Sequence, residues 1–177
     1  MLGHGSGGAV DAPDLVAVRD RCVAARVSVA RVTQPYRVAG RKAPPSAATL
    51  DAGWAAVITA LGRRPTLRKL GFVYGGRSSG ARVACRAAAD DAIAPRPAAV
   101  LALAFPVHPP GRPDRNRMAE LDAVAAPTLV VQGERDPFGM PDSRAGRDVV
   151  VVAGDHSLKK DVTAVADAVL GWLTQLR

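Results

Sequence analysis

A short glycine-rich corner constrains the fold of this chain more than any other stretch. Residues 69–74 are mostly apolar and predict a strand, and the alanine-rich residues after the corner predict a helix. Between them, Gly76, Ser78 and Gly80 form the spacing Gly-x-Ser-x-Gly. This spacing is typical of a tight strand-to-helix turn that pushes one serine hydroxyl out of the fold, because such a turn leaves no room for side chains two residues away.

The register of this motif selects Ser78 rather than Ser79. Ser78 has glycine two residues away on both sides, whereas Ser79 has Arg77 and Ala81. Ser78 is therefore the candidate nucleophile. The alternative is an ordinary turn before a helix with Ser79 as its N-cap, since a serine side chain can accept a hydrogen bond from the free N–H groups of a first helical turn.

Helical and strand patterns alternate along the rest of the chain. This alternation predicts an α/β fold with a mostly parallel sheet and helices on both faces, in one domain over residues 1–177 and without a cap domain over the site. The predicted helices are 13–26, 46–61, a helix ending near 90, 117–125 and 159–176. The predicted strands are 27–32, 69–74 and the buried runs 98–105, 127–132 and 148–152, and 33–45 is expected to be an irregular loop.

The composition indicates a cytoplasmic protein with a core of small apolar residues. Hydrophobic residues make up 48% of the chain but aromatic residues only 4%. No apolar run reaches the ~20 residues of a membrane span, and no signal-peptide pattern opens the sequence. Cys22 and Cys85 fall within predicted helices, where free thiols are commoner than disulfides, so we expect a reducing compartment.

The net charge of +8 raises nucleic acid as a partner. However, the cations are scattered, with no consecutive basic block and no aromatic platform for base stacking. Arginine exceeds lysine alongside abundant alanine, glycine and proline, which is the usage that a GC-rich bacterial genome imposes. We therefore expect a solvated basic surface and no nucleic-acid partner.

Polar residues that could take part in catalysis or binding follow several predicted strands. They are the segment 4–8, Ser78, Asp136 and His156. In a parallel sheet all strand carboxyl ends meet at one edge, where ligands bind. A serine nucleophile needs a base for its proton and a carboxylate to hold that base, and the order Ser78, Asp136, His156 is the order found in α/β-hydrolases.

Two of these residues have structural alternatives. Asp136 precedes Pro137, and an Asp-Pro pair is a common start for a turn. Asp142 and Asp155 compete with it for the carboxylate role, but neither follows a strand at the required distance from the histidine. His156 could also serve only as a cap for the last helix.

Several motifs together resemble the dienelactone-hydrolase-related branch of the α/β-hydrolase family, whose animal relatives include a regulatory subunit of a chromatin acetyltransferase complex. The segments that carry the resemblance are 4–8, 34–40, 75–82, 103–111, 132–139 and 156–158. The resemblance implies Ser78 as nucleophile, Asp136 as acid and His156 as base. It also implies an oxyanion hole made by the backbone N–H groups of Ser79 and Ser6.

The activity that the resemblance implies is that of a carboxylic ester hydrolase with a serine nucleophile. Such an enzyme cleaves an ester, thioester or similar acyl bond through an acyl-enzyme and needs no metal or organic cofactor. The alternative is a hydrolase-shaped binding or scaffold protein without catalysis.

Further side chains are expected to contact a small acyl substrate: His4, Tyr36, Arg37, His108 and Phe138. For His4 the alternative is that it shapes the glycine-rich loop. Arginines occur on both loops that rim the expected site, which favours an anionic substrate; they are Arg37, Arg41, Arg112, Arg115 and Arg117.

The start of the sequence departs from the family pattern. Only Met1 and Leu2 precede Gly3, whereas family members usually begin with further strands. Either the start of the sequence is misplaced, or the sheet lacks the first N-terminal strands and exposes an edge, through which copies of the chain could associate.

Overall fold

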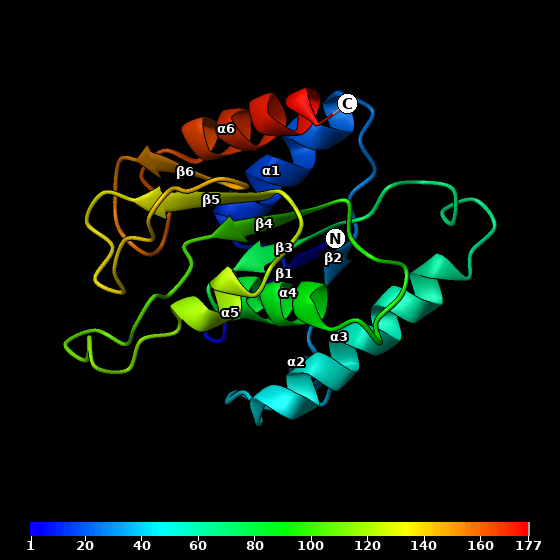
Figure 1. Ribbon diagram of the computed structural model, residues 1–177, viewed down its shortest axis with the longest axis horizontal. Coiled ribbons are helices and arrows are strands. Elements are labelled where there is room, and N and C mark those ends of the chain that lie inside the picture. Colours follow the sequence, from blue (N-terminus) through cyan, green and yellow to red (C-terminus); the bar gives the residue numbers. More distant parts are fainter. Residues whose placement is uncertain (177) are drawn as a thin grey trace.

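Six parallel strands form one sheet in the computed structural model, which describes residues 1–176. Their spatial order is β2 (Arg31–Val32), β1 (Leu2–Gly3), β3 (Val73–Arg77), β4 (Ala99–Leu103), β5 (Thr128–Gly133) and β6 (Arg147–Val152). Every neighbouring pair is parallel, and the arrows of β3 to β6 point the same way in Figure 1. The loops after these strands therefore gather at one edge of the sheet.

Helices cover both faces of the sheet (Figure 1). On one face α1 (Pro13–Ala24) packs along α6 (Val162–Gln175). The other face carries α3 (Ala47–Gly62), α4 (Ser79–Ala89) and α5 (Met118–Asp122), of which α4 packs directly on β3 and β4. The short α2 (Pro35–Val38) lies between β2 and α3 in the chain. This arrangement confirms the predicted α/β architecture.

The central strands alternate their side chains between two apolar cores. Leu101 and Leu103 of β4 face the core beneath α1 and α6, whereas Val100 and Ala102 face the core beneath α3, α4 and α5. Because both faces are covered, the strand reads as a continuous apolar run in the sequence. The sequence also predicts a buried strand at 148–152. That prediction is wrong for β6, because it is an edge strand and leaves Val151 53% exposed.

Three predicted segments have different bounds in the structure. The strand before the corner runs to Arg77 rather than ending at residue 74, because Gly75 and Gly76 pair with both β1 and β4. β2 is only two residues long, against the predicted 27–32. The segment 33–45 contains α2, whose first residue, Pro35, has its φ preset for a helix start. The other elements lie within a few residues of their predictions.

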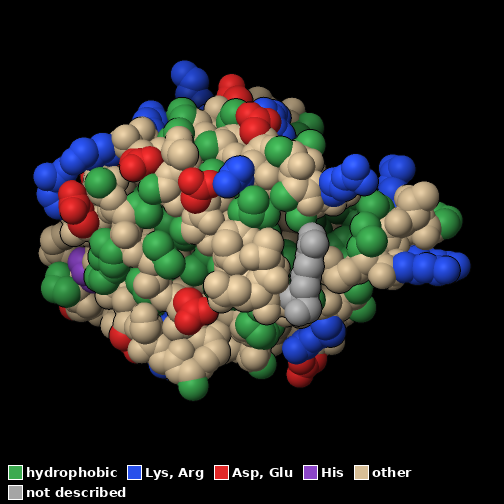
Figure 2. Space-filling model, turned by 90° about the horizontal axis from the view of Figure 1, so that it is seen from above, with side chains coloured by type: hydrophobic (Ala, Val, Ile, Leu, Met, Phe, Trp, Pro, Cys, Tyr) green, Lys and Arg blue, Asp and Glu red, His purple; other side chains and the backbone are tan. Residues whose placement is uncertain are grey.

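The basic residues do not gather on the face above α1 and α6. Figure 2 shows Lys and Arg side chains dispersed over this view and interspersed with Asp and Glu. Arg21 of α1, for example, pairs with Asp167 of α6 at 2.7 Å. Within the described residues, no helix is both long and apolar enough to cross a membrane. The edges of the sheet are β2 and β6, and association of copies through an edge stays a prediction.

The glycines around Ser78 are required by backbone contacts. A Cβ on Gly76 would lie 2.6 Å from the carbonyl carbon of Gly80, and one on Gly80 would lie 2.5 Å from the carbonyl oxygen of Gly3. Real Cβ atoms essentially never approach other atoms this closely. The backbones of β1, β3 and α4 therefore touch at this point, which is the lack of room that the motif predicts.

Replacing Gly76 by alanine should lower the free energy of unfolding by about 1–3 kcal/mol, because the new methyl group overpacks rigid backbone. Gly171→Ala is the matched control, since nothing lies within 4 Å of its added Cβ and it is exposed in α6. That change should stabilise the protein by about 0.5–1 kcal/mol. Urea unfolding of both variants measures the difference, and equal effects would contradict the packing argument.

Candidate active site

Ser78 lies on a strained turn between β3 and α4. Its φ is 53°, in the left-handed region that residues other than glycine seldom adopt. Its N–H donates to the carbonyl oxygen of Leu103 at 2.8 Å, which ties the turn to the end of β4. The N-cap of α4 is Ser78 and its side chain makes no capping hydrogen bond. The alternative with Ser79 as N-cap is therefore wrong, since Ser79 is the first residue of the helix.

Two side chains from the neighbouring loops line up with the Ser78 hydroxyl. His156, in the loop after β6, has its Nε2 atom 2.9 Å from Ser78 Oγ. Its Nδ1 atom is 2.8 Å from Oδ2 of Asp136, in the loop after β5. The Asp136 side chain is fully buried, while that of His156 is 17% exposed. The structure thus brings together the three residues that chain order singles out.

Asp136 is held in place by two further donors. The backbone N–H of Phe138 donates to Oδ1 at 2.8 Å, and Nε2 of Gln132 donates to Oδ2 at 2.8 Å. The first of these is the turn that an Asp-Pro pair predicts, so Asp136 shapes its loop and also faces His156. The carboxylates of Asp142 and Asp155 have other partners, the Arg147 side chain and the Ser157 N–H.

A close backbone approach brings the histidine loop to β5. A Cβ on Gly133 would lie 2.4 Å from the carbonyl oxygen of Asp155, so only glycine lets the two loops come this near. The ring of Phe138 then stacks on the imidazole of His156, with centroids 4.0 Å apart and planes 27° apart. The imidazole is thereby fixed by two hydrogen-bond partners and one ring face.

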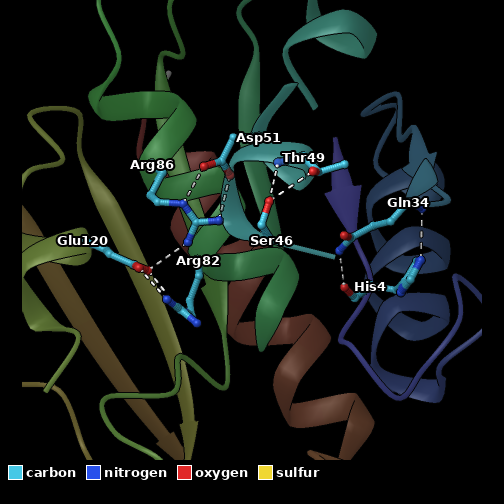
Figure 3. A network of polar contacts seen from close by, with 8 residues as sticks. All are labelled: His4, Gln34, Ser46, Thr49, Asp51, Arg82, Arg86 and Glu120. Atoms are coloured by element: carbon cyan, nitrogen blue, oxygen red, sulfur yellow. Dashed lines mark hydrogen bonds and ion pairs between the residues drawn. The ribbon is translucent and has the colours of Figure 1, made fainter. Parts of the chain in front are cut away.

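Three residues that the sequence predicts at the substrate instead make hydrogen bonds that hold the glycine-rich loop 4–8. His4 is fully buried, and its Nε2 accepts from the Gln34 N–H at 3.1 Å (Figure 3). Its Nδ1 is 2.8 Å from Gly5 O. Burial lowers the pKa of His4, so the ring is neutral with its proton on Nδ1. Tyr36 donates to the carbonyl oxygen of Ser6 at 2.9 Å.

Arg37 supports the same loop, because its Nη2 donates to the carbonyl oxygen of Gly8 at 3.1 Å. The His108 side chain lies beside Gly139, and the backbone N–H of His108 donates to the carbonyl oxygen of Phe138 at 3.0 Å. Neither side chain belongs to the cavity wall around Ser78. Of the five expected substrate contacts only Phe138 lies on that wall, and the others hold the loops that form it.

A cavity of about 680 Å³ opens beside Ser78 and His156. Ser6 and Ser79, whose N–H groups are the expected oxyanion donors, both lie on its wall. The charged side chains of the described wall are mostly cationic: Arg77, Arg82, Arg117, Lys159 and the one acid, Asp11. Of the five rim arginines expected from the sequence, only Arg117 lines the cavity. The other cations come from the end of β3 (Arg77), from α4 (Arg82) and from the segment between β6 and α6 (Lys159).

A second, smaller cavity of about 140 Å³ lies at the opposite end of the sheet. Apolar side chains near the starts of the strands line most of it, among them Leu2, Phe72 and Leu101. None of the predicted site residues reaches it. Ser78 and His156 line the larger cavity instead.

A charged network braces one wall of that cavity (Figure 3). Glu120 of α5 accepts from Arg82 of α4 at 2.5 and 2.8 Å and from Arg86 at 3.1 Å. Arg86 also donates to both oxygens of Asp51 in α3, at 2.7 and 2.8 Å. Burial of the Glu120 carboxyl opposes its ionisation, but the hydrogen bonds and charges of the two arginines outweigh it and lower its pKa. The network joins three helices and orients Arg82.

Sequence reasoning missed several residues that hold this site. Gln132 could have been found, because it is the only strongly polar residue in the apolar run of β5. Its Nε2 also donates to the carbonyl oxygen of Gly139 at 2.9 Å. Asp14 could not, because an acidic residue in a first helical turn fits the helix dipole without any tertiary partner. Its burial against Arg77 is visible only in the fold.

Replacing Glu120 by glutamine should lower the free energy of unfolding by about 1.5–3 kcal/mol at pH 7, because two arginines lose a charged acceptor. The lowered pKa of Glu120 means that this stability is present above its ordinary value of 4.5 and is lost as the pH falls through the folded value. Urea unfolding at several pH values should therefore show the two proteins converging below pH 4.5. A difference that does not change with pH would contradict this assignment.

A parallel sheet with a strained serine between strand and helix, and with an aspartate and a histidine after later strands, defines the α/β-hydrolase class. The chain belongs to this family: the family described as "alpha/beta hydrolase domain" matches residues 1–168. No curated protein matches the chain in sequence.

Solved structures share the fold at low sequence identity. Dienelactone hydrolase from Anabaena variabilis is 23% identical, with a TM-score of 0.73 over 98% of this chain and 84% of its own. Est1E from Butyrivibrio proteoclasticus, solved with ferulic acid, is 16% identical, with a TM-score of 0.76 over 99% of this chain and 87% of its own. XC6422 from Xanthomonas campestris, a serine hydrolase without a lid, is 16% identical, with a TM-score of 0.74 over 98% and 80% of the two chains. The family match over residues 1–168 confirms the predicted α/β-hydrolase membership, and the narrower dienelactone-hydrolase-related branch stays a prediction.

Proposed function

We propose that this protein is a serine hydrolase that cleaves an ester, thioester or similar acyl bond. The observation that carries the proposal is the chain of contacts from Ser78 Oγ through His156 to Asp136, with distances of 2.9 and 2.8 Å. Membership of the α/β-hydrolase family supports a hydrolase, and the open cavity beside the serine is within the size range of small-molecule sites.

In the first step, Ser78 Oγ attacks the acyl carbonyl carbon while Nε2 of His156 takes its proton. Asp136 Oδ2 accepts a hydrogen bond from Nδ1–H, which leaves Nε2 free to act as the base. The buried carboxylate also stabilises the imidazolium that forms. The stacked ring of Phe138 keeps the imidazole from rotating away from the hydroxyl.

The negative charge on the carbonyl oxygen would be held by two backbone N–H groups. One belongs to Ser79; as the first residue of α4 it has no acceptor four residues earlier within the helix, and it lies at the positive end of the helix dipole. The other belongs to Ser6. Its peptide also contains the Gly5 carbonyl oxygen, which lies 2.8 Å from His4 Nδ1 and accepts from the Gly8 N–H at 3.1 Å, and these two contacts orient the peptide.

The attack of Ser78 produces a tetrahedral intermediate. Its collapse breaks the acyl bond, and His156 gives its proton to the departing alcohol or thiol. The acyl group is then bound to Ser78 Oγ as an ester. A water molecule entering the cavity loses a proton to Nε2 and attacks the acyl carbon. When the bond to Ser78 Oγ breaks, His156 passes that proton to Oγ, which releases the acid and restores Ser78 and the neutral imidazole.

Ser78→Ala and His156→Ala should each lower kcat for p-nitrophenyl acetate by about 10⁴-fold or more, because the two residues act as one unit. For the same reason the double variant should be no slower than either single variant. Ser143→Ala is the control, since this serine is exposed and does not line the cavity. Stopped or continuous absorbance assays of the purified variants provide the comparison.

Wild-type protein that is folded and hydrolyses no aryl ester or thioester would contradict the proposal. That result would favour a binding or scaffold protein with the shape of a hydrolase. Activity that survives in Ser78→Ala would contradict the assignment of the nucleophile.

An anionic group on the substrate fits the charges of the cavity. Arg82 is paired with Glu120, but Arg117 and Lys159 have no ion pair within the described residues. The neighbouring charge of Arg82 adds to burial in lowering the pKa of Arg117, so an anion beside it would relieve repulsion between the two arginines.

Arg117→Ala and Lys159→Ala should therefore raise KM for a carboxylate-bearing ester, such as a succinate half-ester, and leave KM for the matching neutral ester unchanged. We expect about a tenfold selectivity loss for each charge, as for a solvent-accessible charged hydrogen bond. Arg112→Ala, on the exposed loop outside the cavity, is the control. Unchanged selectivity in both test variants would refute an anionic substrate.

A cytoplasmic location stays part of this proposal. It is supported by Cys22 and Cys85, which are both free and buried. Burial raises the pKa of Cys85 to about 12, so this thiol packs in the core and is no rival nucleophile.

A further inference from the structure

Arg77, the residue directly before Ser78, makes contacts that the mechanism above does not use. Its Nη2 donates to the backbone carbonyl oxygen of His156 at 3.0 Å. Its Nη1 lies against the glycine-rich loop, where a Cβ on Gly5 would be 3.3 Å away. Its Nε lies 3.2 Å from Oδ2 of Asp14 in the first turn of α1. One guanidinium thus contacts the histidine loop, the glycine-rich loop and the first turn of α1.

The burial of this pair is unusual for charged side chains. Asp14 is 1% exposed and Arg77 is 14% exposed. Neither carboxylate oxygen of Asp14 has a hydrogen-bond partner in the described residues. Burial raises the pKa of Asp14, against the charges of Arg77 and, more weakly, Lys159, which lower it. A buried charge pair of this kind is weak support for stability, so its value has to lie in what it positions.

The other backbone anchors of the loop that carries His156 lie before and after the histidine. The Arg135 N–H donates to the carbonyl oxygen of Gly154 at 2.9 Å. Leu158 N–H bonds back to Asp155 within the loop, and Asp155 approaches Gly133. In the described residues, the hydrogen bond from Arg77 is the one that the His156 carbonyl accepts. Because Arg77 and Ser78 share a peptide bond, this contact sets the position of the base relative to the nucleophile.

We infer that Arg77 is a positioning residue that fixes the His156 backbone and the glycine-rich loop around Ser78, and that Asp14 is the counter-charge that holds its guanidinium. The inference rests on the proposed serine hydrolase function and deepens it. A guanidinium suits this task because its planar set of donors reaches several acceptors at once. A lysine at the same position would keep the charge and contact fewer of them.

Arg77→Ala should lower kcat for p-nitrophenyl acetate about 10- to 100-fold, the cost of a base displaced by roughly 1 Å, with KM unchanged. The rate of modification of Ser78 by a fluorophosphonate should fall by the same factor. Millimolar guanidinium chloride should restore part of both rates, because the free ion fits between Asp14 and His156 O. Arg77→Lys, which keeps a charge beside Asp14 and so folds, should lie between Arg77→Ala and the wild type.

Two controls separate positioning from stability. Asp14→Ala combined with Arg77→Ala should lose the rescue, because no carboxylate then retains the guanidinium. Arg147→Ala removes an arginine that is even more buried, at 3% exposed, and that pairs with Asp122 and Asp142 at the start of β6, far from the histidine loop. It should lower the melting temperature without changing kcat, and guanidinium should not raise its rate.

The failure of the inference differs from the failure of the proposed function. A folded wild-type protein that does not react with the fluorophosphonate overturns both. A wild-type protein that reacts, together with Arg77→Ala and Arg77→Lys variants that react at the same rate, overturns the positioning role alone. A rate loss that guanidinium rescues equally well without Asp14 overturns the counter-charge role.

Discussion

The backbone contact between β1, β3 and the start of α4 is the constraint on which the rest of the site depends. Gly76 and Gly80 let these three backbones touch, and Ser78 is left between them with a positive φ. Strain of this kind persists only where the surrounding structure over-determines it. Here the Ser78 N–H bond to Leu103 and the pairing of β3 with both neighbours supply that surrounding structure.

The loops around the serine are organised by buried polar contacts rather than by residues that reach the cavity. His4, Tyr36 and Arg37 hold the glycine-rich loop, and Gln132 holds Asp136. These contacts fix the orientation of the peptide groups in the glycine-rich loop and of the Asp136 carboxylate. The chemistry proposed for Ser78 thus relies on side chains that do not line the cavity, as preorganised sites require.

Most of the fold could be predicted from the sequence, because buried parallel strands and amphipathic helices have distinct apolar patterns. The three residues aligned at Ser78 could also be predicted, since parallel strands bring their carboxyl ends together. The orientation of Tyr36 or Arg37 could not, because a polar residue in a loop can face either the cavity or the backbone behind it. The burial of Asp14 against Arg77 depends on how α1 packs, and no local pattern encodes that packing.

Reaction of the protein with a fluorophosphonate, followed by peptide mapping, tests the central claim most directly. The probe forms a stable bond only with a serine activated by a neighbouring base, and Ser78 and Ser79 are told apart by fragmentation of the labelled peptide. The account predicts a single adduct on Ser78 that is absent from the His156→Ala variant. An adduct on Ser79, or no adduct on the folded protein, would contradict it.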